Sequence, residues 1–97
     1  MPHEILVVDD EVDIRTAISG ILRDEGYDTR TASNSDEAIS SVRKRLPSLL
    51  ILDIWLQASR LDGLQLLAEI KKSYSSLPIV VISGPVSYTH LRAHETR

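Results

Sequence analysis

The chain has 97 residues, of which 42% are hydrophobic and 26% are charged, and its formal net charge is −3. This length allows one domain, and the core must be aliphatic because the chain has one Trp and no Phe. The absence of cysteine excludes disulfides and thiolate metal sites. The acidic balance argues against nucleic-acid binding by this segment. Since no apolar run is long enough to cross a membrane, and no signal-peptide pattern opens the chain, we expect a cytoplasmic location.

In the first third of the chain, a strand, a helix and a second strand are expected. Ile5–Val8 is an unbroken aliphatic run, typical of a strand buried on both faces. The next apolar residues recur with helical spacing, and Gly26 is a plausible C-terminal stop. That helical face comprises Ile14, Ala17, Ile18, Ile21 and Leu22. The more polar segment Asp28–Ala32 is predicted to form an edge strand.

Two further helices and two strands are expected in the remainder. Asn34, with Glu37 three residues later, fits a capping box at the start of a second helix. Asp62 is placed to cap a third helix, and the strands are Leu49–Leu52 and Ile79–Ile82. The apolar residues are Ala38, Ile39, Val42 and Leu46 in the second helix, which ends at Pro47, and Leu66, Leu67, Ile70 and Tyr74 in the third, which ends at Pro78.

Strands and helices thus alternate, which predicts an α/β fold with a doubly wound parallel sheet. In such folds, ligands bind beyond the carboxyl ends of the strands. The first strand is followed by Asp9 and Asp10, the third by Asp53 and the fourth by Ser83. If the first and third strands are neighbours, three carboxylates converge. Like charges that lie so close repel one another unless a proton is kept or a cation neutralises them. Oxygen ligands favour a hard ion, and Mg²⁺ suits phosphoryl chemistry.

The same residues resemble a known family. Ile5-Leu6-Val7-Val8-Asp9-Asp10-Glu11, Leu50-Ile51-Leu52-Asp53, Asp62-Gly63 and Val80-Val81-Ile82-Ser83-Gly84 together look like a response-regulator receiver domain spanning residues 1–84. The resemblance implies a flavodoxin-like fold of strand order 2-1-3-4-5. It also implies that a sensor histidine kinase phosphorylates Asp53, and that Asp10, Asp53 and the carbonyl of Trp55 bind Mg²⁺. By the same resemblance Asp9 assists through water, and Ser83 contacts the phosphoryl group and acts as a switch.

The loop after Asp53 is about two residues longer than usual and resembles that of NtrX-type nitrogen regulators. That resemblance implies transcription effector domains beyond the receiver, and a receiver homodimer in the full-length protein.

After Gly84 the resemblance ends. Residues 85–97 contain no fifth strand and no counterpart of the family's catalytic Lys, and they resemble a foreign read-through tail. We therefore expect strand 5 and the last helices to be missing, which would leave Ile79–Ile82 as an exposed sheet edge and the fold marginally stable.

Each residue also has an ordinary structural interpretation. Asp10 alone would be a helix cap, and Asp53 and Ser83 alone would be turn residues. His90 and His94 would share a helical face, but no third metal ligand has suitable spacing. The basic run 43–45 is typical of a solvated helix end.

Two other functional classes share parts of the pattern. A dinucleotide-binding enzyme needs glycines after the first strand, where this chain has Asp9 and Asp10. An aspartyl phosphatase would carry a second Asp two residues after the nucleophile, at the position of Trp55. A purely structural module would leave the acidic cluster unexplained.

Overall fold

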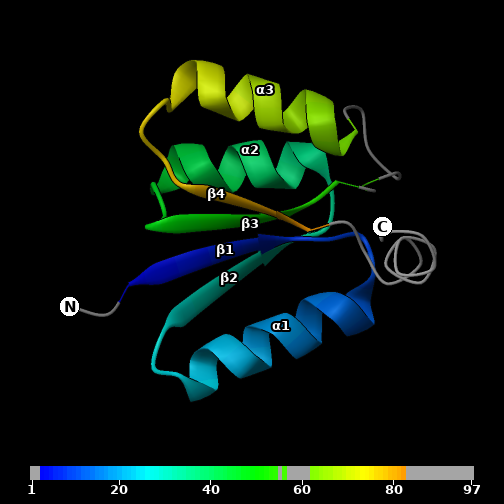
Figure 1. Ribbon diagram of the computed structural model, residues 1–97, viewed down its shortest axis with the longest axis vertical. Coiled ribbons are helices and arrows are strands. Elements are labelled where there is room, and N and C mark those ends of the chain that lie inside the picture. Colours follow the sequence, from blue (N-terminus) through cyan, green and yellow to red (C-terminus); the bar gives the residue numbers. More distant parts are fainter. Residues whose placement is uncertain (1–2, 55, 57–61, 83–97) are drawn as a thin grey trace, which may run out of the picture.

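The computed structural model describes residues 3–54, 56 and 62–82, which form an open parallel sheet between two helical layers. The strands lie in the order β2-β1-β3-β4, as predicted for the first four strands. One face of the sheet carries α1, and α2 and α3 cover the other (Figure 1). Within the described part of the chain the sheet ends at β4. The elements are β1 (Glu4–Val8), α1 (Val12–Asp24), β2 (Asp28–Ala32), α2 (Ser35–Lys44), β3 (Leu49–Asp53), α3 (Gly63–Ser73) and β4 (Ile79–Ile82).

The main core lies between the sheet and the pair α2 and α3. All four aliphatic residues of β1 from Ile5 to Val8 are buried, which explains why this strand shows no polar alternation. Leu6 and Val8 belong to this core, and its other buried apolar residues come from β2, α2, β3, α3 and the loops beside them: Ala32, Ala38, Val42, Leu50, Leu52, Leu56, Leu66, Ile70 and Leu77. None of the helices in the described residues is long and apolar enough to span a bilayer.

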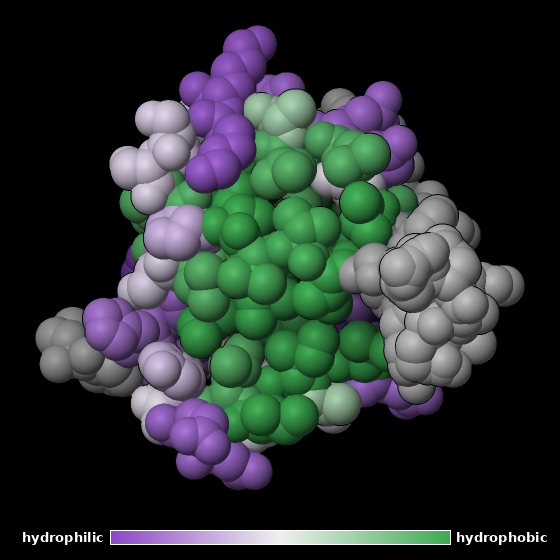
Figure 2. Space-filling view, viewed as in Figure 1, coloured by the Kyte–Doolittle hydropathy of each residue, from purple (hydrophilic) through white to green (hydrophobic). Residues whose placement is uncertain are grey.

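The opposite face of the sheet is covered less completely. The predicted apolar face of α1 divides in two: Ile14, Ile18 and Leu22 are half-buried, whereas Ala17 and Ile21 are exposed. Residues spaced by four lie in one row along a helix; this row and Ser19, the one fully buried residue of α1, face the strands. Figure 2 shows apolar residues gathered across the strands and onto α1.

The edge strand β4 contributes to the exposed apolar surface, since Val80 and Val81 are 47% and 41% exposed. The predicted edge at Ile79–Ile82 is therefore open in the described residues.

The helix ends differ in detail from the predicted ones. Asn34 caps α2 by accepting a hydrogen bond from the Glu37 N–H at 2.8 Å, as expected. The Glu37 carboxylate, however, accepts from the backbone N–H and hydroxyl of Ser33, not from Asn34, so the predicted capping box is only half formed. The prediction that Leu46 belongs to this helix was wrong: α2 ends at Lys44, and Leu46 is exposed.

Two other helix boundaries agree with the sequence. Gly26 follows α1 with a φ of +98°, a left-handed conformation that glycine adopts at little cost. Asp62 caps α3 in a complete capping box with Gln65.

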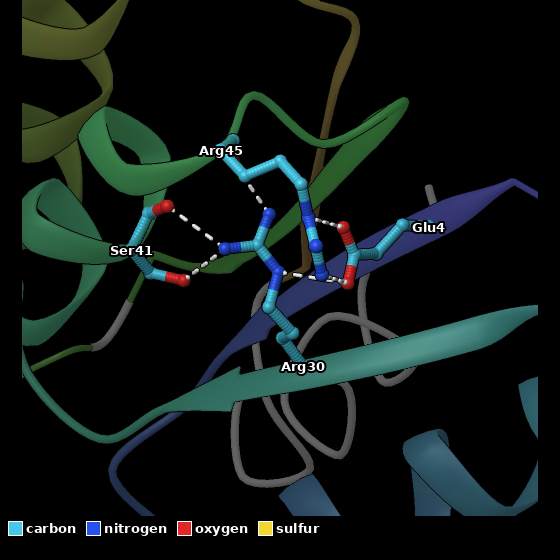
Figure 3. A network of polar contacts seen from close by, with 4 residues as sticks. All are labelled: Glu4, Arg30, Ser41 and Arg45. Carbon is cyan, nitrogen blue, oxygen red and sulfur yellow. Dashed lines mark hydrogen bonds and ion pairs between the residues drawn. The ribbon is translucent and has the colours of Figure 1, made fainter.

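At the N-terminal edge of the sheet, a polar network joins β1, β2 and α2 (Figure 3). The Arg30 guanidinium donates to the Ser41 carbonyl at 2.8 Å, to the Ser41 hydroxyl at 2.7 Å and to the Arg45 carbonyl. Arg45 forms a bidentate pair with Glu4 at 2.8 and 2.9 Å, and Glu4 also lies 3.1 Å from Arg30. Arg30 thus satisfies carbonyls at the C-terminal end of α2, where positive charge is favourable.

We predict that Arg30→Met lowers the free energy of unfolding by about 1–3 kcal/mol, because it removes the charged donor from the Arg45 carbonyl and the Ser41 hydroxyl, while Glu4 keeps its pair with Arg45. Arg43→Met, an exposed change on α2, should alter it by less than about 0.5 kcal/mol. Urea unfolding of both variants measures the difference.

The loss of unfolding free energy caused by Arg30→Met should also depend on pH. The hydrogen bond from Arg45, together with the charges of Arg45 and Arg30, holds the pKa of Glu4 below its ordinary value of 4.5. The lowered pKa of Glu4 stabilises the fold at pH values above the ordinary pKa of 4.5. This stabilisation is lost as the pH falls through the folded-state pKa. Equal unfolding midpoints for Arg30→Met and Arg43→Met at neutral pH would contradict this account of the network.

Candidate functional site

Three carboxylates meet at the carboxyl ends of β1 and β3. Asp9 and Asp10 directly follow β1, and Asp53 is the last residue of β3. The two strands are parallel neighbours in register, with Val8 opposite Leu52, so the residues that follow lie side by side. Oxygen atoms of the three aspartates lie within 4.8 Å of one another. The structure therefore brings together the three acidic residues that the sequence predicted as one site.

Burial makes this cluster electrostatically unfavourable. Asp9 is 2% and Asp53 4% exposed, and Asp10 is half-buried. Burial, together with the smaller effect of the charges of Asp53 and Asp10, raises the pKa of Asp9 from 3.8 to about 6, against the opposing effect of a hydrogen bond from the Glu11 N–H. The fold thus holds more negative charge here than the surroundings stabilise, and a bound cation would relieve it.

The donor set fits a hard divalent cation. All three side chains offer carboxylate oxygen, and no softer ligand belongs to the cluster in the described residues. Opposite ligands of an octahedral Mg²⁺ lie about 4 Å apart, twice the usual Mg–O distance. A spread of at most 4.8 Å is therefore close to what one shared ion requires.

Asp9 is held at three points. Its backbone N–H donates to the Ala32 carbonyl at 3.1 Å, which extends the pairing of β1 with β2 by one residue. Its carboxylate accepts from the Glu11 N–H at 2.8 Å, and its carbonyl accepts from the Arg15 guanidinium at 2.6 Å. Sequence reasoning missed Arg15. Its contact runs from a helix to the end of the preceding strand, six residues earlier in the chain, and no simple periodicity predicts it.

Gly63 brings α3 against the end of β3. A Cβ atom at this position would lie 2.5 Å from the Ile54 carbonyl oxygen and 2.6 Å from that of Asp53. These atoms belong to the backbone and cannot swing aside, so no larger residue fits. The Asp62-Gly63 motif therefore has two structural roles, a helix cap and a close approach to the backbone that carries Asp53.

Other predicted positions lie outside the described residues. They are Trp55, whose carbonyl is a predicted metal ligand, Ser83, the predicted phosphoryl contact and switch, and residues 85–97 with His90 and His94. Their roles stay predictions.

Comparison with known proteins agrees with this geometry. The family pattern of the response regulator receiver domain matches residues 5–94. The match runs past Gly84 into residues that the structure does not describe, so the domain boundary predicted there stays a prediction. The chain is 55% identical over 84 residues to the nitrogen assimilation regulatory protein NtrX of Azorhizobium caulinodans, a match that covers 87% of this chain and 18% of that protein. It is 35% identical over 84 residues to the alkaline phosphatase synthesis transcriptional regulatory protein PhoP of Bacillus subtilis, covering 87% of this chain and 34% of PhoP.

Solved structures show the same fold. The receiver domain of NtrX from Brucella abortus superimposes with a TM-score of 0.82 at 56% identity, covering 92% of this chain and 74% of that one. The response regulator TrrA of Thermotoga maritima, solved in complex with Mg²⁺-BeF, gives a TM-score of 0.79 at 35% identity, covering 97% of this chain and 76% of that one.

The pKa of Asp9 generates a prediction about stability in metal-free buffer. A carboxyl whose pKa is raised on folding, here from 3.8 to about 6, stabilises the fold below its unfolded value, and this contribution is lost as the pH rises through the folded value. Asp9→Asn cannot ionise, so it should be more stable than the parent at pH 7.5 by on the order of 2–3 kcal/mol. The difference should shrink by pH 5. Urea unfolding in the presence of a chelator tests this.

The matched control is Asp13→Asn, which removes the same charge from an exposed position of α1. Asp13→Asn should not raise the free energy of unfolding at pH 7.5. If Asp9→Asn and Asp13→Asn changed stability equally at both pH values, the buried charge of Asp9 would not be the cause.

The packing of Gly63 generates a second prediction. Gly63→Ala should lower the free energy of unfolding by about 1–3 kcal/mol, the usual cost of overpacking. The control is Gly20→Ala on α1, where a Cβ would meet nothing within 4 Å and should stabilise the helix by about 0.5–1 kcal/mol. Thermal melting of the two variants should shift in opposite directions, and a shift in the same direction would count against the close approach of α3.

Proposed function

This chain belongs to the response regulator receiver domain family, the phosphoacceptor domains of two-component signalling, and on that premise we propose that Asp53 is its phosphoacceptor. The single observation that supports this assignment is the meeting of Asp53 with Asp9 and Asp10 at one edge of the sheet. Among the three, Asp53 ends the central strand β3 and Asp9 and Asp10 flank it from β1. A carboxylate nucleophile with acidic neighbours is the arrangement that metal-assisted phosphoryl transfer to aspartate needs.

In the proposed reaction, a carboxylate oxygen of Asp53 attacks the phosphorus of a phosphohistidine. A P–O bond forms as the P–N bond breaks, and the leaving imidazole keeps the electron pair of that bond and takes up a proton from solvent. The product is an acyl phosphate on Asp53. The pairing of β3 with β1 and the close approach of α3 fix the backbone that carries Asp53.

We propose that Asp10 and Asp53 ligate Mg²⁺ directly, that Asp9 assists through water, and that the backbone carbonyl of Trp55 completes the protein ligands. The ion would neutralise the clustered carboxylates and the charge on the transferring oxygens. Ser83 would then contact the phosphoryl group and act as the switch. We also propose that the domain supports its own phosphorylation and dephosphorylation as a signalling domain, without turning over an external substrate.

The partner we propose is a sensor histidine kinase. The chain spans less than a fifth of the length of the NtrX protein it matches, so the output of the whole protein is a proposal too. By similarity to a nitrogen assimilation regulator, we propose that phosphorylation controls a transcription effector domain, and that receiver dimerisation takes part in this control.

A dinucleotide-binding function fits the site poorly. The first turn after β1 presents Asp9, Asp10 and Glu11 to the space where a pyrophosphate would approach the start of α1. Without a cation these charges repel phosphate.

The test is phosphorylation with acetyl phosphate and Mg²⁺, followed by intact mass and by lability in base. The parent chain should gain one base-labile phosphoryl group, slowly because residues 85–97 contain no Lys, and Asp53→Asn should gain none, because an amide is not a nucleophile of this kind. Asp10→Ala should need more Mg²⁺ for the same rate. Asp13→Asn serves as the control for loss of charge. Uptake by Asp53→Asn at the parent rate would place the acceptor elsewhere.

A further inference from the structure

One side chain from outside the acidic cluster forms a hydrogen bond with the backbone of the cluster. Arg15 lies in the first turns of α1, and its guanidinium donates a hydrogen bond of 2.6 Å to the carbonyl oxygen of Asp9. Asp9 is almost fully buried, and a buried carbonyl without a donor is costly. The contact therefore fixes the peptide that joins Asp9 to Asp10, the two carboxylates contributed by this loop.

A carboxylate on a second element also interacts with this guanidinium through its charge. Glu37 lies at the start of α2, where its carboxylate accepts from the backbone N–H of Ser33 at 2.7 Å and from the Ser33 hydroxyl at 2.8 Å. These two hydrogen bonds hold the pKa of Glu37 below its ordinary value, and the charge of Arg15 adds a smaller effect in the same direction. Glu37 thus attracts Arg15 weakly, and the hydrogen bond to the Asp9 carbonyl is the contact that places the guanidinium.

We propose that Arg15 is a positioning residue of the metal site, which fixes the loop carrying Asp9 and Asp10 by holding the carbonyl of Asp9. This inference rests on the proposed function of the site. It assigns to Arg15 an effect on metal affinity through geometry, without contact with the metal or with the phosphoryl group.

Removing the charge of Arg15 and removing its hydrogen bond should change the affinity for Mg²⁺ in opposite directions. The positive charge of Arg15 beside the carboxylates repels Mg²⁺, so removing Arg15 should tighten Mg²⁺ binding if charge alone mattered. Losing the hydrogen bond should instead let the Asp9–Asp10 peptide move away from the ligating arrangement, which weakens binding. Loss of groups that orient metal ligands typically lowers metal affinity by about 10–100-fold.

The variants are Arg15→Met, Arg15→Lys and the control Arg23→Met. Met keeps the helix propensity and the apolar stem of Arg, and Arg23 is an exposed arginine in the last turn of the same helix. Titration calorimetry of the intact chain gives the Mg²⁺ dissociation constant, and melting without Mg²⁺ shows whether each variant is folded. We expect Arg15→Met to raise the dissociation constant about 10-fold, Arg15→Lys to raise it less, and Arg23→Met to leave it unchanged or lower it.

The rate of phosphorylation by acetyl phosphate provides a second readout. Saturating Mg²⁺ should restore the maximal rate of Arg15→Met to that of the parent, because only the affinity for the ion is impaired. Unchanged or tighter Mg²⁺ binding in folded Arg15→Met would overturn the proposal. If that variant does not fold, an unchanged dissociation constant in Arg15→Lys overturns it. Failure of the parent chain to bind Mg²⁺ would instead contradict the proposed function of the site.

Discussion

The constraint on which the rest of the structure depends is the repulsion among Asp9, Asp10 and Asp53. Parallel pairing of β1 with β3 forces the residues after the two strands together, and burial raises the free energy of their ionised forms. A retained proton or a bound cation relieves this repulsion, and we propose that a bound cation would also supply its charge to phosphoryl transfer. The stability of the fold and its chemistry are therefore linked through the same three side chains.

The scaffold keeps these side chains from moving apart in two ways. Asp9 is held through its N–H, its carboxylate and its carbonyl, so that its backbone and side chain are both anchored. Asp53 lies where α3 approaches the backbone of β3 so closely that only Gly63 fits. The network of Glu4, Arg30 and Arg45 lies at the other end of the strands. It joins β1, β2 and α2 without adding charge to the site.

Much of this arrangement could be predicted from the sequence, because it follows from local patterns. The unbroken aliphatic runs at Ile5–Val8 and Ile79–Ile82 indicated parallel strands, of which the first is buried and the second is a half-exposed edge, and the carboxyl ends of such strands indicated the site. Helix capping depends on a side chain and a backbone N–H only three residues apart. The caps at Asn34 and Asp62 were therefore predicted correctly.

What could not be predicted depends on contacts between elements. The contact of Arg15 with the Asp9 carbonyl requires the angle at which α1 leaves β1. The partner of Glu37 is Ser33 and not Asn34, a choice made by the path of the chain into α2. Ile21 lies on the predicted apolar face of α1 but is exposed, since helical periodicity cannot show how much of a face the sheet covers.

The most direct test of the central claim is fluorine NMR of the chain with beryllofluoride, a mimic of the phosphoryl group. If Asp53 and the neighbouring carboxylates form one metal-dependent acceptor site, a bound fluoride resonance should arise only when Mg²⁺ and beryllofluoride are both present. It should be absent in Asp53→Asn under the same conditions. A bound resonance that persists in Asp53→Asn, or that forms without a divalent cation, would contradict the account.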